Sequence, residues 1–401
     1  MNKLKCFLIN LIFSFFFLSL AVQNLPAIEN LSALGKSVGD NDAIVVADPD
    51  GRIIYEKNGG KKLIPASTLK LLTSLAALHY LGPEYRFATE FYLDKDSNLK
   101  VKGYGDPLLT SEILIEISKT LGSGIKYIND LILDDSYFKP AKIPGVTSSL
   151  EPYDSPNGAL CANFNTVNFD ILRGKPVSAE PQTPLLPFAL NKINRSSIKE
   201  GRILLSSDRN ENTLYAGHLL SYFLEKEGIK PKGKIMVGAV RPETDRLILK
   251  YSSPFSMEDV ISRLLLHSNN FIANQIVLAI SAKINGPPGS LDKGVSAISD
   301  FAVNILKTDD LTIVEGSGIS RENRITAKGF LHILAAFEPH MALMKHNGNE
   351  YFKTGTLTGV STRAGYIKGS DGRLYKYVIM TNSNGNSAEK ISKKLCGLLG
   401  G

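Results

Sequence analysis

The first residues of the chain combine positive charge with a long apolar run. Two lysines within the first five residues precede the apolar run 7–22, whose end carries the small residues Ser19 and Ala21. A short basic segment, an apolar core of about 7–15 residues and a small-residue exit are typical of a signal peptide. The pattern therefore predicts a signal peptide over residues 1–21 and export of the chain. An uncleaved membrane anchor stays open, because about 20 apolar residues suffice to span a bilayer.

Two strands and a long helix are predicted next. Residues 43–47 and 52–56 are strand-like, and the turn residues Asp-Pro-Asp-Gly at 48–51 join them into a hairpin. A helix then opens at residues 64–70 and is stopped by Gly82-Pro83. Its apolar stripe follows a period near 3.6. The positions of that stripe are Leu69, Leu72, Leu75, Ala76 and His79.

The middle of the chain changes character. Between Tyr85 and Leu247, short strand-like runs and helical runs alternate with turns rich in Pro and Gly, and residues 181–187 are loop-like. We interpret residues 86–246 as a β-rich inserted domain. The helical period returns from Met257 onward.

The C-terminal part is rich in strands. Residues 351–357, 364–368 and 374–381 look extended, and a last helix is expected over residues 387–399. Two strands near the start and about three near the end can form one antiparallel sheet that is flanked by helices. The predicted fold class is therefore α+β. Its main domain is built from two segments, 22–85 and 247–401, around the insertion.

Composition narrows the classes of function. The chain has 401 residues, 43% of them hydrophobic, and a formal net charge of +7. The charge suits an anionic partner, but no long Lys/Arg block points to nucleic acid. Six scattered histidines, with no H-E-x-x-H and no C-x-x-C, give no metal-site spacing, so no metal or other cofactor is expected. Beside Cys6, the thiols of Cys161 and Cys396 are expected to be separate and buried, with pairing left open.

Three short motifs carry the candidate chemistry. They are Ser67-x-x-Lys70, Ser268-Asn269-Asn270 and Lys353-Thr354-Gly355. S-x-x-K alone has little weight because it occurs six more times, but only Ser67 follows Pro-Ala and opens a long apolar helix. K-T-G occurs once. The three motifs in this order are the signature of class A β-lactamases and penicillin-binding proteins.

The chemistry of the first motif follows from helix geometry. A serine hydroxyl is a weak nucleophile until a base removes its proton. Residues three apart share one face of a helix, so Lys70 can reach the hydroxyl of Ser67. A lysine acts as a base only when neutral, and burial or a nearby cation, for which Lys353 is the candidate, lowers its pKa.

The other two motifs each have two interpretations. Ser268 and Asn270 lie in a break between helices, where they can relay a proton and hold a peptide amide, or merely cap the junction. Lys353 and Thr354 on a strand suit a substrate carboxylate, and Gly355 allows close approach of a peptide. The alternative for this strand is an edge that lysine protects from aggregation.

Several passages together resemble the class C low-molecular-mass penicillin-binding proteins, the D-alanyl-D-alanine carboxypeptidase/endopeptidase family. Beyond the three motifs, they include a G-D-P segment, an insert stretch and a G-S-G-L-S-R-like loop, in which Glu315 stands where Asp is usual. The middle residue of the second motif, Asn269, also departs from the frequent S-D-N. The passages are residues 65–70, 105–107, 153–156, 163–165, 268–273, 316–321 and 353–357.

The resemblance implies a serine β-lactamase/DD-peptidase-like domain split by an insertion. It implies Ser67 as the acyl-enzyme nucleophile and Lys70 as the general base. Ser268 becomes the proton relay and Asn270 a substrate-amide contact. Substrate-binding residues are Lys353, Thr354, Gly355 and Thr356, with the oxyanion hole formed by the backbone N–H groups of Ser67 and Thr356.

The same resemblance implies the partners and the compartment. Peptidoglycan stem peptides are the expected substrates, β-lactams the acylating inhibitors, and the periplasm of the bacterial envelope the location. Peripheral membrane association stays open. A β-lactamase is the nearest alternative, but no E-x-x-L-N stretch supplies its deacylating glutamate. A non-catalytic β-lactam sensor or wall-binding protein on the same fold is the other alternative.

Overall fold

The computed structural model describes residues 31–147 and 149–400 of the chain. These residues form two compact units. The first unit contains the described residues up to Thr68, the short segment Thr308–Leu311 and the residues from Arg324 onward. The second unit contains Leu69–Lys307 and Thr312–Asn323. The predicted signal peptide lies outside the described residues.

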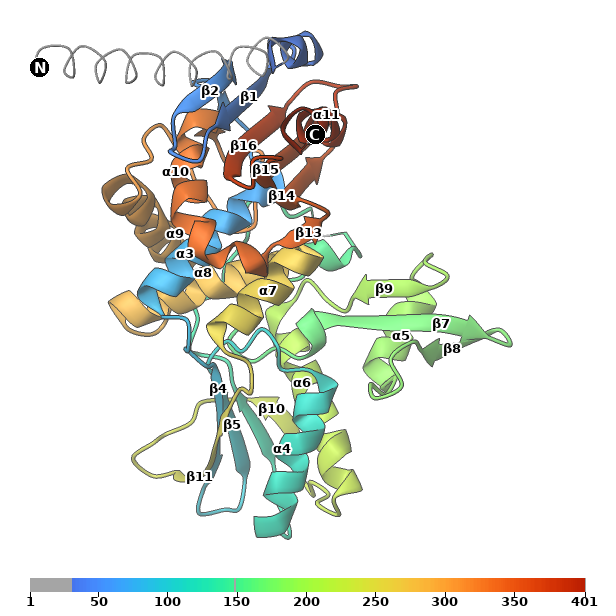
Figure 1. The fold of residues 1–401 in the computed structure, drawn as a ribbon. Coiled ribbons are helices and arrows are strands. Elements are labelled where there is room, and N and C mark those ends of the chain that lie inside the picture. The colour runs from blue at the N-terminus through green and yellow to red at the C-terminus, as the bar shows by residue number, and fades with distance from the viewer. Residues whose placement is uncertain (1–30, 148, 401) are drawn as a thin grey trace, which may run out of the picture. The chain divides into compact units, whose positions relative to one another are not determined.

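The first unit is built on a six-stranded antiparallel sheet in the order β13-β14-β15-β16-β1-β2. The predicted hairpin is confirmed as β1 and β2, and the three predicted C-terminal strands are β14 to β16. The short β13 is the strand that the prediction of about five missed. Figure 1 shows the early and late strands side by side in this sheet. Their bounds are β1 Asp42–Ala47, β2 Ile53–Lys57, β13 Lys345–Asn347, β14 Glu350–Leu357, β15 Val360–Lys368 and β16 Leu374–Thr381.

Helices cover both faces of this sheet, because side chains alternate along each strand. On one face, Ile44 and Ile367 join a buried cluster with Leu395 of α11, which runs Ala388–Gly400. On the other face, the Tyr366 hydroxyl donates to the carbonyl of Leu334 in α10 at 2.5 Å. Helix α10 runs Ala327–Phe337. The small strands β3 (Lys62–Leu63) and β12 (Ile325–Thr326) pair beside the sheet, and the short turn η1 covers Ala33–Ser37.

The second unit contains a group of helices around α8. Twelve of the sixteen residues of α8 are buried, from Phe271 to Ala282, so the helix is enclosed on every side. Helices α3, α7 and α9 pack against it. The bounds are α3 Lys70–Tyr80, α7 Met257–His267, α8 Asn270–Asn285 and α9 Leu291–Asp300, which continues into the turn Phe301–Ile305.

A mixed five-stranded sheet forms the second part of this unit. Its order is β10-β6-β5-β4-β11. Strands β10, β6 and β5 run parallel to one another, and β4 pairs antiparallel with both β5 and β11. Helices α4 and α6 share a buried core with it, through residues such as Ile117, Leu219 and Leu131. The bounds are β4 Ala88–Leu93, β5 Leu99–Gly103, α4 Ser111–Gly124, β6 Leu131–Asp134, α6 Arg209–Lys226, β10 Ile235–Val237 and β11 Arg246–Ser252.

A third sheet completes the middle of the chain. It has the order β8-β7-β9 and is accompanied by helix α5. The inserted segment thus contains helices as well as strands, and β11 carries its sheet beyond residue 246, the boundary predicted from the sequence. That boundary remains a prediction. The bounds are β7 Thr166–Leu172, β8 Lys175–Ser178, α5 Pro187–Arg195 and β9 Gly201–Leu204.

Two further observations concern the thiols and the membrane. Cys161 and Cys396 are both free; Cys161 is buried and Cys396 is half-buried, so the expectation of two buried thiols holds fully only for Cys161. Burial raises the pKa of the Cys161 thiol to about 12. Among the described residues, no helix has the length and apolarity needed to cross a membrane.

Candidate active site

The predicted nucleophile lies at the start of a continuous helical run. Ser67 belongs to the 3₁₀ turn Ala66–Leu69 (η2), and α3 follows from Lys70 without a break. The chain enters this turn with Ala66 in the left-handed region, at a φ of +47°. The carbonyl of Pro65 accepts hydrogen bonds from the hydroxyls of Thr68 and Thr362, both at 2.7 Å. The entry to the helix is therefore fixed from the neighbouring strand β15 as well as from within.

Strand β14 passes directly against this turn. A Cβ atom added to Gly355 would lie 2.7 Å from the backbone nitrogen of Ser67, which is closer than real Cβ contacts come. Only glycine fits here, because it alone lacks a side chain. In the first unit, the structure thus brings together the first motif's serine and the third motif's glycine.

The rest of the third motif lies along the same strand. Lys353 is 3% exposed, and its ammonium donates to the carbonyl of Thr354 at 2.7 Å. Burial, together with the positive charge of Lys345, lowers the pKa of Lys353 to about 8. The side chains of Thr354 and Thr356 are exposed. Strand β13 pairs with β14 only as far as Phe352, so the pairing with β13 ends where this motif begins.

The predicted base lies in the second unit and is fully buried. The Nζ atom of Lys70 donates to the Oδ1 atom of Asn270 and to the carbonyl of Ser317, both at 2.7 Å. Both acceptors are neutral oxygens rather than carboxylates. The structure therefore brings together the lysine of the first motif and the asparagine of the second. Sequence reasoning missed the Ser317 carbonyl, because a backbone atom leaves no signature in the residue pattern.

The second motif forms the junction between α7 and α8. Ser268 follows α7 in the left-handed region, with a φ of +53°, and its N–H donates to the carbonyl of Leu264. Asn269 caps α8, with its Oδ1 atom accepting from the N–H of Ile272 at 3.0 Å. The predicted break between helices is confirmed. The side chain that caps α8 is that of the middle residue, which leaves the Asn270 amide for Lys70.

A buried carboxylate shapes the loop that offers the Ser317 carbonyl to Lys70. Glu315 is fully buried and accepts hydrogen bonds from backbone and side-chain donors of the loop that follows it and from Asn274 of α8. Because several donors converge on one charged group, the loop conformation depends on this carboxylate. The donors are Ser317 N (2.7 Å), Ser317 Oγ (2.6 Å), Gly318 N (2.7 Å), Ser320 N (3.4 Å), Asn323 Nδ2 (2.7 Å) and Asn274 Nδ2 (3.3 Å).

The helices on either side hold the same loop. The Thr73 hydroxyl, one turn after Lys70, donates to the carbonyl of Gly316 at 2.6 Å. The Oδ1 atom of Asn274, one turn after Asn270, accepts from the N–H of Gly316 at 2.8 Å. Lys70, Asn270 and the loop are therefore bound as one assembly from α3 and α8. Sequence reasoning noted that Glu315 replaces an aspartate but gave it no role.

Residues in or next to two further passages of the resemblance form hydrogen bonds with α8. The side-chain amide of Gln275 donates to the carbonyls of Gly105 and Gly158, at 3.1 and 2.9 Å. Asn157 donates to the carbonyl of Phe271 at 2.9 Å. Asp106 is buried, which raises its pKa to about 6, while its carboxylate accepts from the N–H of Leu108. The hydrogen bonds of Gln275 and Asn157 therefore tie the inserted segment to the helix that carries Asn270.

The fold and the order of these motifs define the class of protein, a serine hydrolase of the penicillin-recognising kind. Residues 26–347 match the D-Ala-D-Ala carboxypeptidase 3 (S13) family. The match covers most of the chain, and the chain belongs to this family.

Individual relatives agree with this assignment. The chain is 25% identical to a D-alanyl-D-alanine carboxypeptidase from Actinomadura sp. (strain R39), over 86% of this chain and 77% of that protein. Penicillin binding protein 4 (dacB) from Haemophilus influenzae has a similar crystal structure, with a TM-score of 0.73 at 23% identity over 90% of this chain and 95% of that one. A penicillin G-acylated predatory endopeptidase from Bdellovibrio bacteriovorus, in complex with an immunity protein, gives a TM-score of 0.54 at 17% identity over 89% and 91%. The two structures show that the fold is shared.

Proposed function

We propose that the chain is a serine-type D-alanyl-D-alanine carboxypeptidase that hydrolyses peptidoglycan stem peptides and is acylated by β-lactams. Endopeptidase activity is its proposed second activity. The observation that carries the proposal is the fully buried Lys70, held by Asn270 and Ser317 three residues after Ser67. Burial disfavours the charged form of a lysine, and a neutral lysine close in sequence to a serine can act as its general base.

The proposed reaction has two steps. Lys70 takes the hydroxyl proton of Ser67 while the oxygen attacks the carbonyl carbon of the D-Ala–D-Ala bond. The resulting oxyanion is held by the backbone N–H groups of Ser67 and Thr356. The C–N bond then breaks, and the leaving D-alanine amine receives a proton through Ser268. Lys70, neutral again, then takes a proton from a water molecule whose oxygen attacks the ester carbonyl carbon. The C–O bond to Ser67 breaks, the shortened peptide leaves as its carboxylic acid, and the proton on Lys70 returns to the Ser67 oxygen.

The third motif supplies the proposed contacts to the substrate. The Lys353 ammonium anchors the terminal carboxylate, and the exposed hydroxyl of Thr354 adds a donor. The edge of β14 beyond Phe352 accommodates an extended peptide by strand addition, with Gly355 admitting close approach. Membership of the family supports these roles.

Covalent labelling with a fluorescent penicillin tests the proposal. The complete protein is expected to form a stable adduct at Ser67, to lose it in Ser67→Ala, and to release D-alanine from a wall pentapeptide. Labelling without release of D-alanine would point to a sensor instead. Rapid hydrolysis of the antibiotic would point to a β-lactamase.

A second prediction concerns the carboxylate anchor. Because the pKa of Lys353 is lowered to about 8, its ammonium is charged below that pH and neutral above it. The KM for a peptide with a free terminal carboxylate should therefore rise as the pH passes above about 8. In Lys353→Gln this KM should be raised at least about tenfold, with the pH dependence removed. Steady-state kinetics would contradict the role if a C-terminally amidated peptide suffered the same loss.

The location is also part of the proposal. The basic and apolar N-terminal pattern supports export, and a peptidoglycan substrate lies outside the cytoplasmic membrane, so we propose that the protein acts in the periplasm. Cell fractionation tests this, and recovery of the protein in the cytoplasm with Met1 retained would contradict it.

A further inference from the structure

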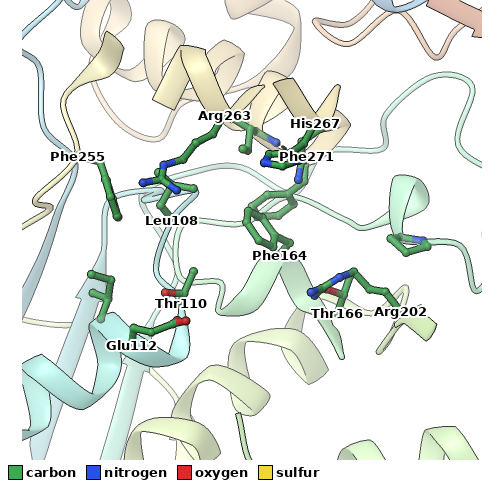
Figure 2. A pocket seen from close by; sticks show the side chains of 14 residues that line it. Leu108, Thr110, Glu112, Phe164, Thr166, Arg202, Phe255, Arg263, His267 and Phe271 are labelled. Carbon is green, nitrogen blue, oxygen red and sulfur yellow. Dashed lines mark hydrogen bonds between the residues drawn. The ribbon is translucent and has the colours of Figure 1, made fainter. Parts of the chain in front are cut away.

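A pocket of about 600 Å³ lies within the second unit, beside the junction of α7 and α8. Its volume falls in the range of small-molecule and peptide sites. Figure 2 shows Arg263 and His267 reaching it from one side, and Thr110 and Glu112 from the other. Its lining includes Glu112, Phe164, Arg202, Phe255, Arg263 and Phe271.

The pocket adjoins the second catalytic motif. His267 and Asn269 line it, and they are the two neighbours of Ser268 in sequence. Asn270, the next residue, bonds instead with Lys70. The turn that carries the motif therefore presents its neighbouring side chains to the pocket and its amide to the proposed base. A ligand in the pocket would contact the same turn.

An aromatic surface is held in the pocket by strained backbone. Phe164 lies in the left-handed region at a φ of +60°, between Asn163 and Asn165, which are also left-handed. Such a conformation is costly for a phenylalanine and persists only when its surroundings impose it. The Ser155 hydroxyl donates to the Phe164 carbonyl at 2.6 Å, and the Thr166 hydroxyl to that of Asn163 at 2.8 Å.

The left-handed backbone at Phe164 goes together with an edge-to-face contact between two aromatic rings. The Phe164 ring packs against the Phe271 ring, with 6.1 Å between the ring centroids. Figure 2 shows both rings at the centre of the pocket wall. The fixed turn therefore places an aromatic ring in the wall of the pocket.

The charges of the pocket are not equivalent. Arg202 is already occupied, because it donates to the Thr166 hydroxyl at 2.8 Å and pairs with the Glu180 carboxylate. Glu112 accepts a hydrogen bond from Gln182 at 2.8 Å. Arg263 forms no ion pair within 4 Å with any carboxylate of the residues described.

The setting of Arg263 favours a planar anion. Its guanidinium lies over the Phe255 ring, 4.3 Å from the centroid. The carboxylate of Asp259, on the same helix, accepts hydrogen bonds from Ser256 in the capping box, which together with the charge of Arg263 hold the pKa of Asp259 below its usual range. Stacking occupies the faces of a guanidinium and leaves its N–H edge for a bidentate partner, for which a carboxylate has the matching geometry.

We propose that this pocket binds a carboxylate-bearing peptide segment of peptidoglycan, with its apolar part against Phe164 and Phe271 and its carboxylate on Arg263. The inference rests on the proposed function, because it takes the substrate polymer as the source of the ligand. A peptide with methyl-bearing residues and free carboxylates matches both the aromatic wall and the guanidinium of Arg263. The pocket thereby gives the enzyme a second binding site for peptidoglycan, next to the turn that carries Ser268.

Binding to the acylated enzyme tests the inference. The complete protein is first acylated with penicillin, verified by mass, so that Ser67 is blocked. A soluble wall tetrapeptide with free carboxylates is then titrated by calorimetry. We expect saturable binding that weakens at least about tenfold in Arg263→Gln and for the fully amidated peptide. Phe164→Asn, which tolerates the left-handed backbone, should weaken both peptides.

The matched control is Arg246→Gln, which alters an exposed arginine of β11 outside the pocket and should leave the affinity unchanged. The inference is overturned if the acylated protein binds no tetrapeptide, if Arg263→Gln binds it as well as the parent protein does, or if inorganic phosphate competes better than the peptide. Failure to form the penicillin adduct would instead overturn the proposed function. The two failures are therefore distinguishable.

Discussion

Replacing Lys70 with arginine is expected to lower the rate of penicillin labelling and of D-alanine release by about 10²–10⁴-fold, the usual contribution of general-base catalysis. The substitution keeps a positive charge at this position. A guanidinium, however, stays protonated at any working pH and cannot accept the hydroxyl proton of Ser67. Labelling followed over time by gel fluorescence measures the effect.

Two further variants separate loss of the base from loss of the fold. Lys70→Met has a similar length without charge, and it should also fail to label while showing a cooperative thermal transition. The matched control is Lys293→Arg, because Ser290 and Lys293 have the same spacing at the start of α9 but Lys293 is exposed. If Lys70→Arg labelled at the rate of the parent protein, Lys70 would not be the base.

Replacing Glu315 with glutamine is expected to have the next largest effect. The amide group of glutamine would face the donors that the carboxylate accepts, and the loop would lose its only charged acceptor among these contacts. The free energy of unfolding should fall by on the order of 3 kcal/mol, as for charged hydrogen bonds in a buried site. The Ser317 carbonyl would then no longer be held against Lys70, and labelling should slow by about tenfold or more.

The conservative variant Glu315→Asp decides between positioning and general destabilisation. It keeps the charge and should recover most of the labelling rate, although the shorter side chain reaches fewer donors. Denaturant unfolding of each variant allows labelling to be compared under conditions where all are folded. A Glu315→Gln protein that is destabilised but labels at the parent rate would show that the carboxylate supports the fold alone.

Much of the local architecture could be predicted from the sequence. The hairpin β1–β2, the helix that starts at Lys70 and the three C-terminal strands are all confirmed, because their periods and turn residues are local signals. Family membership was accessible for the same reason, since each motif is a short stretch in fixed order. The assignment of Ser67, Ser268 and Lys353 to one catalytic reaction remains a proposal.

The partners of the motif residues could not be predicted in this way. The Ser317 carbonyl that accepts from Lys70 lies 247 positions away in sequence. The role of Glu315 depends on donors that converge only when the loop and α8 are folded. The pocket at Arg263 likewise gathers residues from 108 to 272. None of these contacts recurs at a regular spacing along the chain, so the periodicity of apolar residues cannot predict them.

The sequence by itself determined the class of the protein, the positions of its motifs, and the course of the helix after Ser67, the last helix and the terminal strands. Backbone propensities and apolar periods specify these features over a few residues at a time. Only the tertiary structure decided which oxygens hold Lys70, which carboxylate shapes the loop beside it and which groups surround each arginine of the pocket. Those features arise from close packing between distant segments, where the geometry of one side chain is set by the others.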